Sequence, residues 1–297
     1  MKQVIIKIVA FVGLFFALDW GLGLLIGYFH DTSNNINLRD ANYGFLESPE
    51  DDILIFGASE LSHALISSRM TEKTGLSTYN LACDACGIYY QYPLLETILD
   101  KHSPKAIILS SNQMNAENLR YLSKLYPFYR KNEHAKQMID ELRPNEFFKL
   151  ALQGYVYNSQ LIRVLDSKDP NLNGYVPLPA VESKRWITSI KILPPGEEYH
   201  FTEKSTSYFR KFVQKAQSAG ATVYVFLPPT LENMDGNYHR KLLSHIEKSG
   251  AKSIDFSNDR NMQDNRSLFF DRTHLNDDGA QVMTDKVLQV LKQDGVY

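Results

Sequence analysis

The chain is poor in the residues that several common site types require. Its 297 residues include only two cysteines, the formal net charge is -2, and no long basic block or internal repeat is present. Two thiols cannot complete a structural zinc site, and the balanced charge argues against a nucleic-acid partner. No glycine-rich nucleotide motif follows a strand, and no His-Glu-x-x-His motif occurs. We therefore expect no metal and no cofactor.

The two cysteines stand close together, as Cys83-x-x-Cys86. A redox pair of this spacing usually opens a helix in a thioredoxin-like context, and the flanking sequence does not provide that context. Two packed thiols are one interpretation. A local disulfide is the alternative if the domain lies in an oxidising compartment.

The one long hydrophobic run lies at the N-terminus. From Val4 to Phe29 nearly every residue is apolar, and a membrane span needs about 20 such residues. Lys2 and Lys7 stand at its start, so the positive-inside rule predicts a cytoplasmic N-terminus and an extracytoplasmic remainder. A cleaved signal peptide is the competing interpretation, but the run is long for one and no small-x-small site follows it.

Asp19 interrupts the middle of this run. A charge at that depth costs roughly 2.5–3.5 kcal/mol on insertion scales. It indicates either a polar contact with a partner membrane protein or a carboxyl that the apolar neighbours tolerate. We expect a transmembrane anchor over residues 1–30, a polar linker over 31–50 and a globular domain over 51–297.

The globular domain alternates short apolar runs with helix-compatible segments, the rhythm of a doubly wound sheet. This predicts an α/β fold: a flavodoxin-like three-layer sandwich around a mostly parallel sheet. A helical insertion is expected around residues 116–200, whose part 170–195 forms either a lid or a plain packing insertion. We expect strands at 53–56, 78–81, 106–109, 222–227 and 253–256, and helices at 61–74, 89–99, 204–219, 239–248 and 277–292. The first of these helices should end at Gly75, and Asn276 should cap the last one.

The first strand leads into a turn that carries Ser59. The continuously apolar run 53–56 is typical of a strand buried on both faces, Gly57 permits a tight turn, and helix-compatible residues follow. A serine there lies at the carboxyl end of a strand, where open α/β sheets place ligands. Its N–H also lies at a helix N-terminus, which favours negative charge. A helix N-cap is the alternative role.

A second polar pair precedes the last expected helix, in the sequence Asp271-Arg-Thr-His274. A nucleophilic serine needs a base, and the base needs a group that fixes its tautomer. Asp271 and His274 supply both if the loop reaches Ser59. The alternative is a loop histidine beside a turn-forming aspartate.

Together these segments resemble the SGNH (GDSL-type) hydrolase superfamily, whose signature has four separated blocks. The first block is matched by Gly57-Ala58-Ser59, where the family commonly has Asp in place of Ala58, although membrane-anchored branches often have a small residue there. The second is a glycine after the next strand, matched by Gly87. The resemblance covers about residue 51 to the C-terminus, apart from the insertion.

The third block is an asparagine at the end of a later strand, matched by Asn112, although Gln113 replaces the usual aspartate. The fourth is Asp-x-x-His before the terminal helix, matched by Asp271 and His274. Asn115 is a rival to Asn112.

The resemblance implies a role for each matched residue. Ser59 attacks an ester carbonyl, His274 carries the proton, and Asp271 orients the imidazole. The oxyanion is held by the N–H groups of Ser59 and Gly87 and by the side-chain amide of Asn112, each such donor being worth about 2.7–4 kcal/mol of barrier. One helical turn after the serine, His63 shares its face and is a candidate substrate contact.

An anchor followed by such a domain resembles extracytoplasmic proteins that handle acyl groups on cell-surface polymers. These include polysaccharide O-acetyltransferases and esterases, and the teichoic-acid D-alanylation protein. The implied partners are an acylated carbohydrate, the membrane and a membrane-bound O-acyltransferase. Two alternatives stay open: a non-catalytic scaffold or glycan-binding subunit, to which Ala58 and Gln113 point, and an anchored α/β protein that faces the cytoplasm.

Overall fold

A computed structural model describes residues 1–33, 35–47, 49–115, 119–157, 160, 164, 172–180, 191–192 and 201–297. The chain divides into two compact units. Unit 1 comprises Met1–Glu47 and Leu119–Pro170, and unit 2 comprises Ser48–Asn118 and Asn171–Tyr297. We describe each unit by itself.

Unit 2 is built on a parallel sheet of five strands in the order β2-β1-β3-β5-β7. The predicted α/β class and the mostly parallel sheet are confirmed. A separate pair of two-residue parallel strands, β4 (Lys191–Ile192) and β6 (Glu232–Asn233), completes the described strands. The sheet strands are β1 (Ile53–Phe56), β2 (Thr78–Asn80), β3 (Ala106–Ser110), β5 (Thr222–Leu227) and β7 (Lys252–Asp255).

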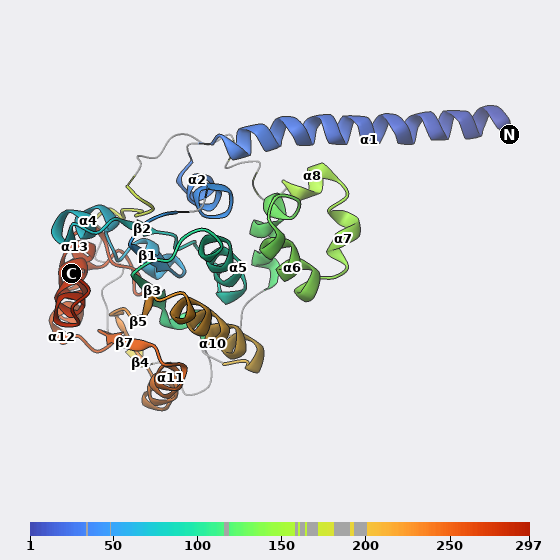
Figure 1. The fold of residues 1–297 in the computed structure, drawn as a ribbon. Helices are drawn as coiled ribbons and strands as arrows, with labels where there is room; N and C mark the ends of the chain where they lie inside the picture. The colour runs from blue at the N-terminus through green and yellow to red at the C-terminus, as the bar shows by residue number, and fades with distance from the viewer. Residues whose placement is uncertain are drawn as a thin grey trace. The chain divides into compact units, whose positions relative to one another are not determined.

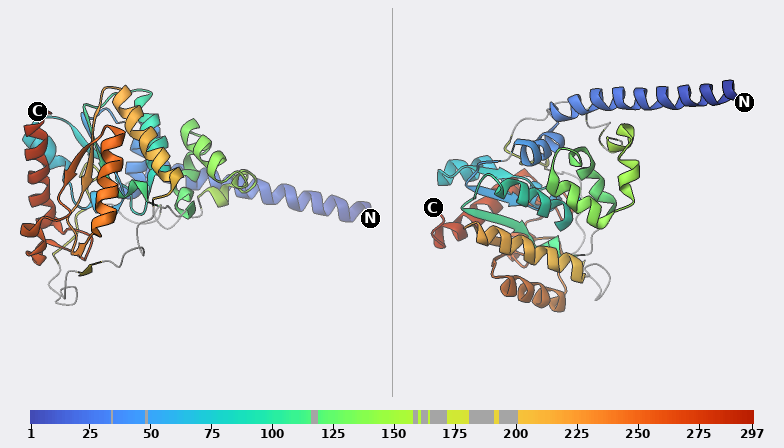
Figure 2. Two further views of the ribbon diagram at one scale, coloured as in Figure 1. Left: turned by 90° about the horizontal axis from the view of Figure 1, so that it is seen from below. Right: turned by 45° about the vertical axis from the view of Figure 1, so that its right-hand side comes forward.

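Helices cover both faces of this sheet, as the three-layer prediction requires. Figure 1 and Figure 2 show α4 and α13 on one face and α5, α10 and α11 on the other. These helices are α4 (Ser67–Thr74), α5 (Ile88–Leu99), α10 (Glu203–Ser218), α11 (Gly236–Ser249) and α13 (Asp277–Gln293). Short turns of helix lie between them: α3 (Ser59–Ser62), η2 (Ser111–Met114), α12 (Arg260–Gln263) and η5 (Arg266–Leu268).

Alternation along β1 divides its side chains between the two layers of the core. Ile53 and Ile55 belong to the cluster that also contains buried residues of α4 and α13. The side chain of Phe56 points to the other face of the sheet. There its ring packs edge to face on that of Phe212 in α10, with centroids 5.2 Å apart. Because every β1 side chain is buried, the strand reads as one unbroken apolar run.

The helix predicted over residues 61–74 is wrong as one continuous helix. It is two short helices, α3 and α4, separated at His63–Ile66. The Asn80 side-chain amide donates to the carbonyls of Leu61 and Leu65 at 2.9 and 3.1 Å, so carbonyls that a continuous helix would bond internally have another partner. The predicted end at Gly75 is confirmed, with φ +72°.

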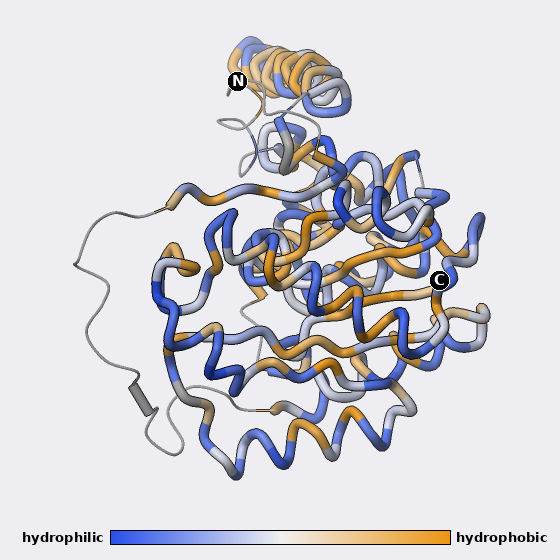
Figure 3. Tube along the Cα trace, turned by 90° about the vertical axis from the view of Figure 1, so that its left-hand side faces the viewer, coloured by the Kyte–Doolittle hydropathy of each residue, from blue (hydrophilic) through white to orange (hydrophobic). Residues whose placement is uncertain are grey.

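The regular elements among the described residues of unit 1 are all helices. Its longest element is α1 (Lys2–Asp31), 30 residues whose apolar colour dominates in Figure 3 and whose length and composition suffice to cross a membrane. Residues 31–50, expected as a linker, include α2 (Ile36–Asn42) and a π-helical turn, η1 (Tyr43–Glu47). The remaining helices are η3 (Leu119–Phe128), a 3-10 segment, then α6 (Glu133–Leu142), α7 (Glu146–Lys149) and α8 (Gln153–Val156).

Most of the segment 170–195, expected as a lid or packing insertion, lies outside the described residues. Besides β4, its described part is residues 172–180, which contact elements of unit 2. The Asn173 carbonyl accepts from the N–H of Asn80 at 2.9 Å, and Val176 N–H donates to the Ser62 carbonyl at 2.9 Å. Gly174 has φ +82°, and a Cβ there would lie 1.7 Å from the Asn80 carbonyl oxygen, so no side chain fits.

Candidate active site

The sheet order places the candidate site at a reversal of strand order. Strand β1 pairs with β2 on one side and with β3 on the other, so the chain crosses from one side of β1 to the other between β2 and β3. Ligands in open α/β sheets bind beyond the carboxyl ends of strands at such a switch point. Ser59 follows the end of β1 and Asn112 follows the end of β3.

The turn after β1 requires a glycine for steric reasons. A Cβ on Gly57 would lie 2.8 Å from Cβ of Ser110, at the end of the adjacent β3. The Gly57 carbonyl accepts from the N–H of Cys83 at 2.9 Å and from Nε2 of Gln91 at 2.6 Å, which holds the turn in place. Ser59 is the first residue of α3, so the helix itself leaves its N–H unbonded.

The loop that carries the histidine is held at both of its ends. Phe269 and Leu275 form an antiparallel bridge, and the side-chain oxygen of Asn276 accepts from the N–H of Gly279 at 3.0 Å, the predicted cap of α13. A Cβ on Gly279 would lie 2.1 Å from the Leu268 carbonyl oxygen. The His274 backbone therefore has little freedom.

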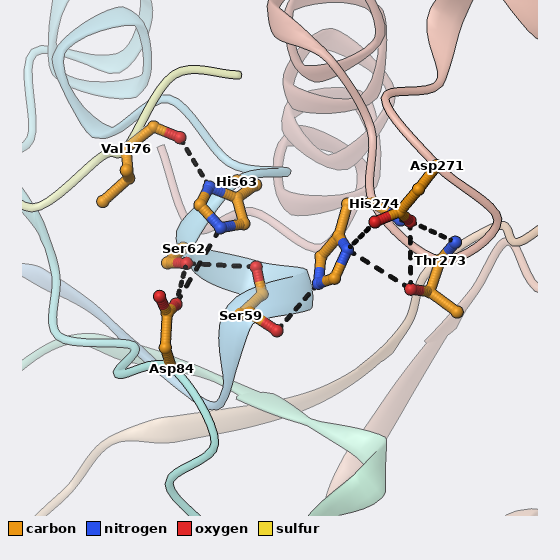
Figure 4. Close-up of polar contacts among 8 residues, drawn as sticks. All are labelled: Ser59, Ser62, His63, Asp84, Val176, Asp271, Thr273 and His274. Carbon is orange, nitrogen blue, oxygen red and sulfur yellow. Dashed lines mark hydrogen bonds and ion pairs between the residues drawn. The ribbon is translucent and has the colours of Figure 1, made fainter.

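Three of the predicted residues meet in one line of hydrogen bonds (Figure 4). His274 Nε2 lies 2.8 Å from Oγ of Ser59, and His274 Nδ1 lies 2.8 Å from Oδ2 of Asp271. The predicted contact between loops 215 residues apart is therefore present. Because an ionised carboxylate only accepts hydrogen bonds, Nδ1 carries the proton of the neutral ring. Nε2 is then the acceptor for the serine hydroxyl.

Hydrogen bonds keep the aspartate ionised. Burial opposes ionisation, but the imidazole and the N–H groups of Thr273 and His274, each 2.8 Å from Oδ1, hold the pKa of Asp271 well below its usual range. In turn, the hydrogen bond to Asp271 raises the pKa of His274 above its ordinary value, against the effect of burial. The pair therefore combines a fixed negative charge with an imidazole of increased basicity.

A second network, which the sequence analysis did not predict, connects the residue after the serine to Asn112. Glu60 is hydrogen bonded to Ser110, whose Oγ lies 3.0 Å from Oδ1 of Asn112. The Ser110 hydroxyl has one proton, so both contacts are hydrogen bonds only when the Glu60 carboxyl donates to Ser110 Oγ and Ser110 donates to Asn112; burial raises the pKa of Glu60 in that direction. Gln113 Nε2 donates to the same Asn112 oxygen at 2.8 Å. Both bonds orient the Asn112 amide by its carbonyl and leave its NH2 for another acceptor.

The remaining predicted oxyanion residues have distinct surroundings. Gly87 ends the loop after β2 and is the N-cap residue of α5, so it lies at a helix N-terminus as Ser59 does. Asn115, the rival to Asn112, accepts at Oδ1 from the hydroxyl of Tyr238 in α11 at 2.9 Å. Of the two asparagines, Asn112 is the one joined to Glu60 and so to the Ser59 turn. The oxyanion roles themselves stay predictions.

His63 lies beside the line of three residues. Its ring meets that of His274 edge to face, with centroids 5.4 Å apart, and its Nδ1 donates to the Val176 carbonyl at 2.7 Å. Burial lowers the pKa of His63, which favours the neutral ring; with Nδ1 as the donor, Nε2 of that ring is an acceptor. That nitrogen lies 3.8 Å from Oδ1 of Asp84, whose side chain is 48% exposed.

Glu60, Ser110 and the Val176 carbonyl were not predicted as parts of the site, although the sequence carried a signal for the first two. Glu60 is a charged residue directly after a buried strand and turn, and Ser110 is the polar end of an apolar strand, so both sit where open sheets bind ligands. Nothing in the sequence pointed to the Val176 carbonyl. Cys83 and Cys86, both described, are not joined by a disulfide. Among the described residues no group of three or more His, Cys, Asp or Glu is arranged to hold a metal.

No protein-family model and no curated protein matches this chain. Several solved structures do. Protein YXIM from Bacillus subtilis is 13% identical with a TM-score of 0.45, over 84% of this chain and 58% of its own length. The psychrotrophic esterase EstA from Pseudoalteromonas sp., inhibited by monoethylphosphonate, is 12% identical with a TM-score of 0.39, over 82% and 98%. The acetyl xylan esterase AlAXEase is 14% identical with a TM-score of 0.42, over 80% and 99%. At this level of similarity no residue role or substrate carries over.

Proposed function

We propose that this chain is a serine-dependent acyl hydrolase or acyltransferase. Ser59 is the nucleophile, His274 the general base and acid, and Asp271 the group that orients the imidazole. The observation that supports this most strongly is the unbroken line from Ser59 Oγ through His274 to Asp271, with both hydrogen bonds 2.8 Å long. An N-cap serine and a loop histidine with structural roles alone would not require this alignment.

The proposed reaction proceeds in two halves. Ser59 Oγ bonds to the ester carbonyl carbon while its proton passes to His274 Nε2, and the carbonyl π electrons move to oxygen. Collapse of this oxyanion breaks the bond to the leaving alcohol, which takes the proton from Nε2 and leaves an acyl-serine. Water or a sugar hydroxyl then gives its proton to Nε2 and attacks the acyl carbon, and the bond from that carbon to Oγ breaks. Nε2 returns the proton to Oγ, which restores the free serine and the neutral imidazole.

Oxyanion stabilisation is assigned to three donors: the N–H groups of Ser59 and Gly87 and the amide of Asn112. Ser59 and Gly87 lie at helix N-termini, where the backbone favours negative charge. The bonds from Ser110 and Gln113 to the Asn112 carbonyl leave its NH2 available. We place His63 at the edge of the substrate site, where its Nε2 can accept a hydrogen bond from a substrate hydroxyl.

The substrate and location follow from the sequence resemblance and from α1. We propose an acyl, most simply acetyl, ester of a cell-surface polysaccharide, handled outside the cytoplasm by a chain anchored through α1. The length and apolar composition of α1 support the anchor, and Lys2 and Lys7 support an inward-facing N-terminus. A membrane-bound O-acyltransferase is the proposed partner.

The test is covalent capture on the full chain in lipid nanodiscs. A fluorophosphonate should label Ser59, identified by peptide mass, and incubation with candidate acyl donors should give an acyl adduct on the same residue. Hydrolysis of a small acetyl ester should accompany labelling, and a sugar acceptor that competes with water would indicate transfer. Polymer binding without any adduct or turnover would overturn the catalytic proposal in favour of a scaffold or glycan-binding subunit.

A further inference from the structure

The acidic residue in the middle of α1 has a partner inside unit 1. Asp19 Oδ2 accepts a hydrogen bond from the backbone N–H of Gln153 at 2.7 Å, and Oδ1 accepts one from the N–H of Gly154 at 2.9 Å. These are the first two residues of α8, whose first-turn N–H groups have no acceptor within the helix. The carboxylate therefore caps α8, a role distinct from both interpretations of Asp19 made from the sequence.

Two glycines extend this contact along the same face of α1. Gly23 and Gly27 follow Asp19 at intervals of four residues, which places all three on one side of the helix. A Cβ on Gly23 would lie 2.0 Å from Cβ of Gln153, and one on Gly27 would lie 2.7 Å from the hydroxyl oxygen of Tyr157. The C-terminal half of α1 is thus fitted closely to the segment around α8. Beside this contact Leu24, Leu25 and Tyr28 stay exposed, while the Trp20 ring has the Arg130 guanidinium 5.0 Å from its centroid.

The position of this contact along α1 corresponds to the edge of a bilayer. A hydrocarbon core is about 30 Å thick and a helix rises about 1.5 Å per residue, so a span needs about 20 residues. Counted from Val4, where the apolar run begins, such a span ends near Gly23. The α8 segment meets α1 from Asp19 to Gly27, which is the level of the outer boundary if α1 crosses the membrane.

Two large aromatic side chains project from the neighbouring helix α7. Phe147 is 58% exposed and Phe148 is 77% exposed, and their rings meet edge to face with centroids 5.4 Å apart. Figure 1 and Figure 2 both show α7 on the side of unit 1 toward the N-terminal end of α1. This is the side that would face the bilayer.

The residue before this aromatic pair fixes the orientation of α7. Glu146 is buried and forms ion pairs with Arg143 at 2.8 Å and Lys149 at 3.2 Å, and it accepts a hydrogen bond from the hydroxyl of Tyr155. Because Glu146 points inward and is held by three partners, the phenylalanines that follow it are turned outward. Lys149 pairs with Glu146, yet its side chain is 54% exposed and its ammonium can also reach an anionic headgroup.

We propose that Phe147 and Phe148 insert into the outer interface of the bilayer that α1 crosses, which attaches unit 1 to the membrane at two points. This inference rests on the anchor in the proposed function. Aromatic rings with neighbouring basic groups are the side chains that membrane interfaces favour. A second insertion point would fix the rotation of unit 1 about the axis of α1, because a single helix leaves that rotation free.

The test measures depth in the membrane for the full chain in nanodiscs that contain anionic lipid. With Cys83→Ser and Cys86→Ser as background, a nitroxide is attached at Phe148→Cys, at Leu14→Cys within α1, or at Gln137→Cys on the exposed surface of α6. Collision with oxygen, which concentrates in lipid, is compared with collision with a water-soluble nickel chelate. We expect positions 14 and 148 to favour oxygen and position 137 to favour nickel, with the ratio at position 148 at least fivefold above that at 137. Far-ultraviolet circular dichroism checks that each variant is folded.

The possible outcomes separate this inference from the anchor. If position 14 favours oxygen while position 148 matches position 137, the interfacial insertion is overturned and the anchor stands. If position 14 also favours nickel, both fail. A nitroxide at position 148 that is shielded from both reagents, with spin broadening that grows with the number of chains per disc, would show a second copy on this surface and would also overturn the inference.

Discussion

The candidate site can be compared with another group of serine, histidine and aspartate in unit 2, because the two groups differ in the order of their contacts. In the candidate site the imidazole stands in the middle, 2.8 Å from both the serine oxygen and the aspartate oxygen. In the second group the carboxylate of Asp255 stands in the middle. It lies 2.6 Å from Oγ of Ser257 and 2.7 Å from Nε2 of His239, while those two atoms are 3.5 Å apart.

The difference shows that the order of contacts decides the chemistry, although the residue types are the same. A base takes the proton of a serine only if it touches the hydroxyl, and an aspartate orients the base only from the other ring nitrogen. Ser257 instead donates its hydroxyl proton to the Asp255 carboxylate. The same carboxylate also accepts a hydrogen bond from the backbone N–H of Ser257 at 3.0 Å. This is the local hydrogen bonding of a turn, and Ser257 is only 3% exposed. The second group therefore provides matched controls for the first.

The largest expected effect comes from removing the two serines in turn. Ser59→Ala should lower kcat/KM for an acetyl ester by at least about 10⁴-fold, because no other group forms the acyl intermediate. Ser257→Ala should leave kcat/KM near the wild-type value and cost about 1 kcal/mol of stability through its lost hydrogen bond. Steady-state kinetics and urea unfolding measure both. Equal losses of activity in the two variants would erase the distinction between the groups.

Exchanging each aspartate for asparagine should sharpen the comparison and reveal the pH dependence. Asp271→Asn should lower kcat/KM on the order of 10³–10⁴-fold because the imidazole loses its tautomer, whereas Asp255→Asn should stay near wild type. His274 must be neutral to accept a proton, so wild-type activity rises with pH through its pKa, which Asp271 raises above 6.5. In Asp271→Asn the pKa of His274 should fall, so the acidic limb of the residual activity should move to lower pH. An unshifted acidic limb in a pH profile would contradict this assignment.

A smaller effect is expected from the network behind Asn112, which has no counterpart in the second group. Ser110→Ala should lower kcat about 10²-fold with little change in KM, because the Asn112 amide acts on the transition state alone and the variant loses a bond that orients it. Glu60→Gln should retain activity and leave the acidic limb in place, since an amide also donates to Ser110 and a protonated Glu60 carries no charge to lose. A downward shift of the limb in Glu60→Gln would mean that Glu60 is ionised.

The smallest effect should come from His63, which adjoins the candidate site without joining its line of contacts. His63→Ala should raise KM about fivefold, the equivalent of about 1 kcal/mol for one hydrogen bond. His63→Asn retains a donor for the Val176 carbonyl but removes the acceptor near Asp84. If the KM of His63→Asn is as high as that of His63→Ala, His63 contacts the substrate. If the KM of His63→Asn returns to the wild-type value, His63 only holds Val176 in place.

The elements of the sheet were predictable because their signals are local. The strand at 53–56 is apolar at every position since both of its faces are covered. Gly75 ends α4 through its positive φ, and Asn276 caps α13 with its own side-chain oxygen. The break between α3 and α4 was not predictable, because the group that replaces the helical bonds is the side chain of Asn80 on another element. For the same reason the cap that Asp19 places on α8, 134 residues away, left no trace in the sequence.

The sequence by itself determined the parallel α/β sheet of unit 2, the apolar helix of unit 1 and the identity of the residues at the strand ends. These follow from periodicity and turn chemistry, which act over a few neighbouring residues. Only the tertiary structure decided that His274 contacts Ser59, that Glu60 and Ser110 support Asn112, and that Ser257, Asp255 and His239 meet in a different order. Such contacts join residues from distant elements, and their order depends on a few ångströms of packing that no local pattern encodes.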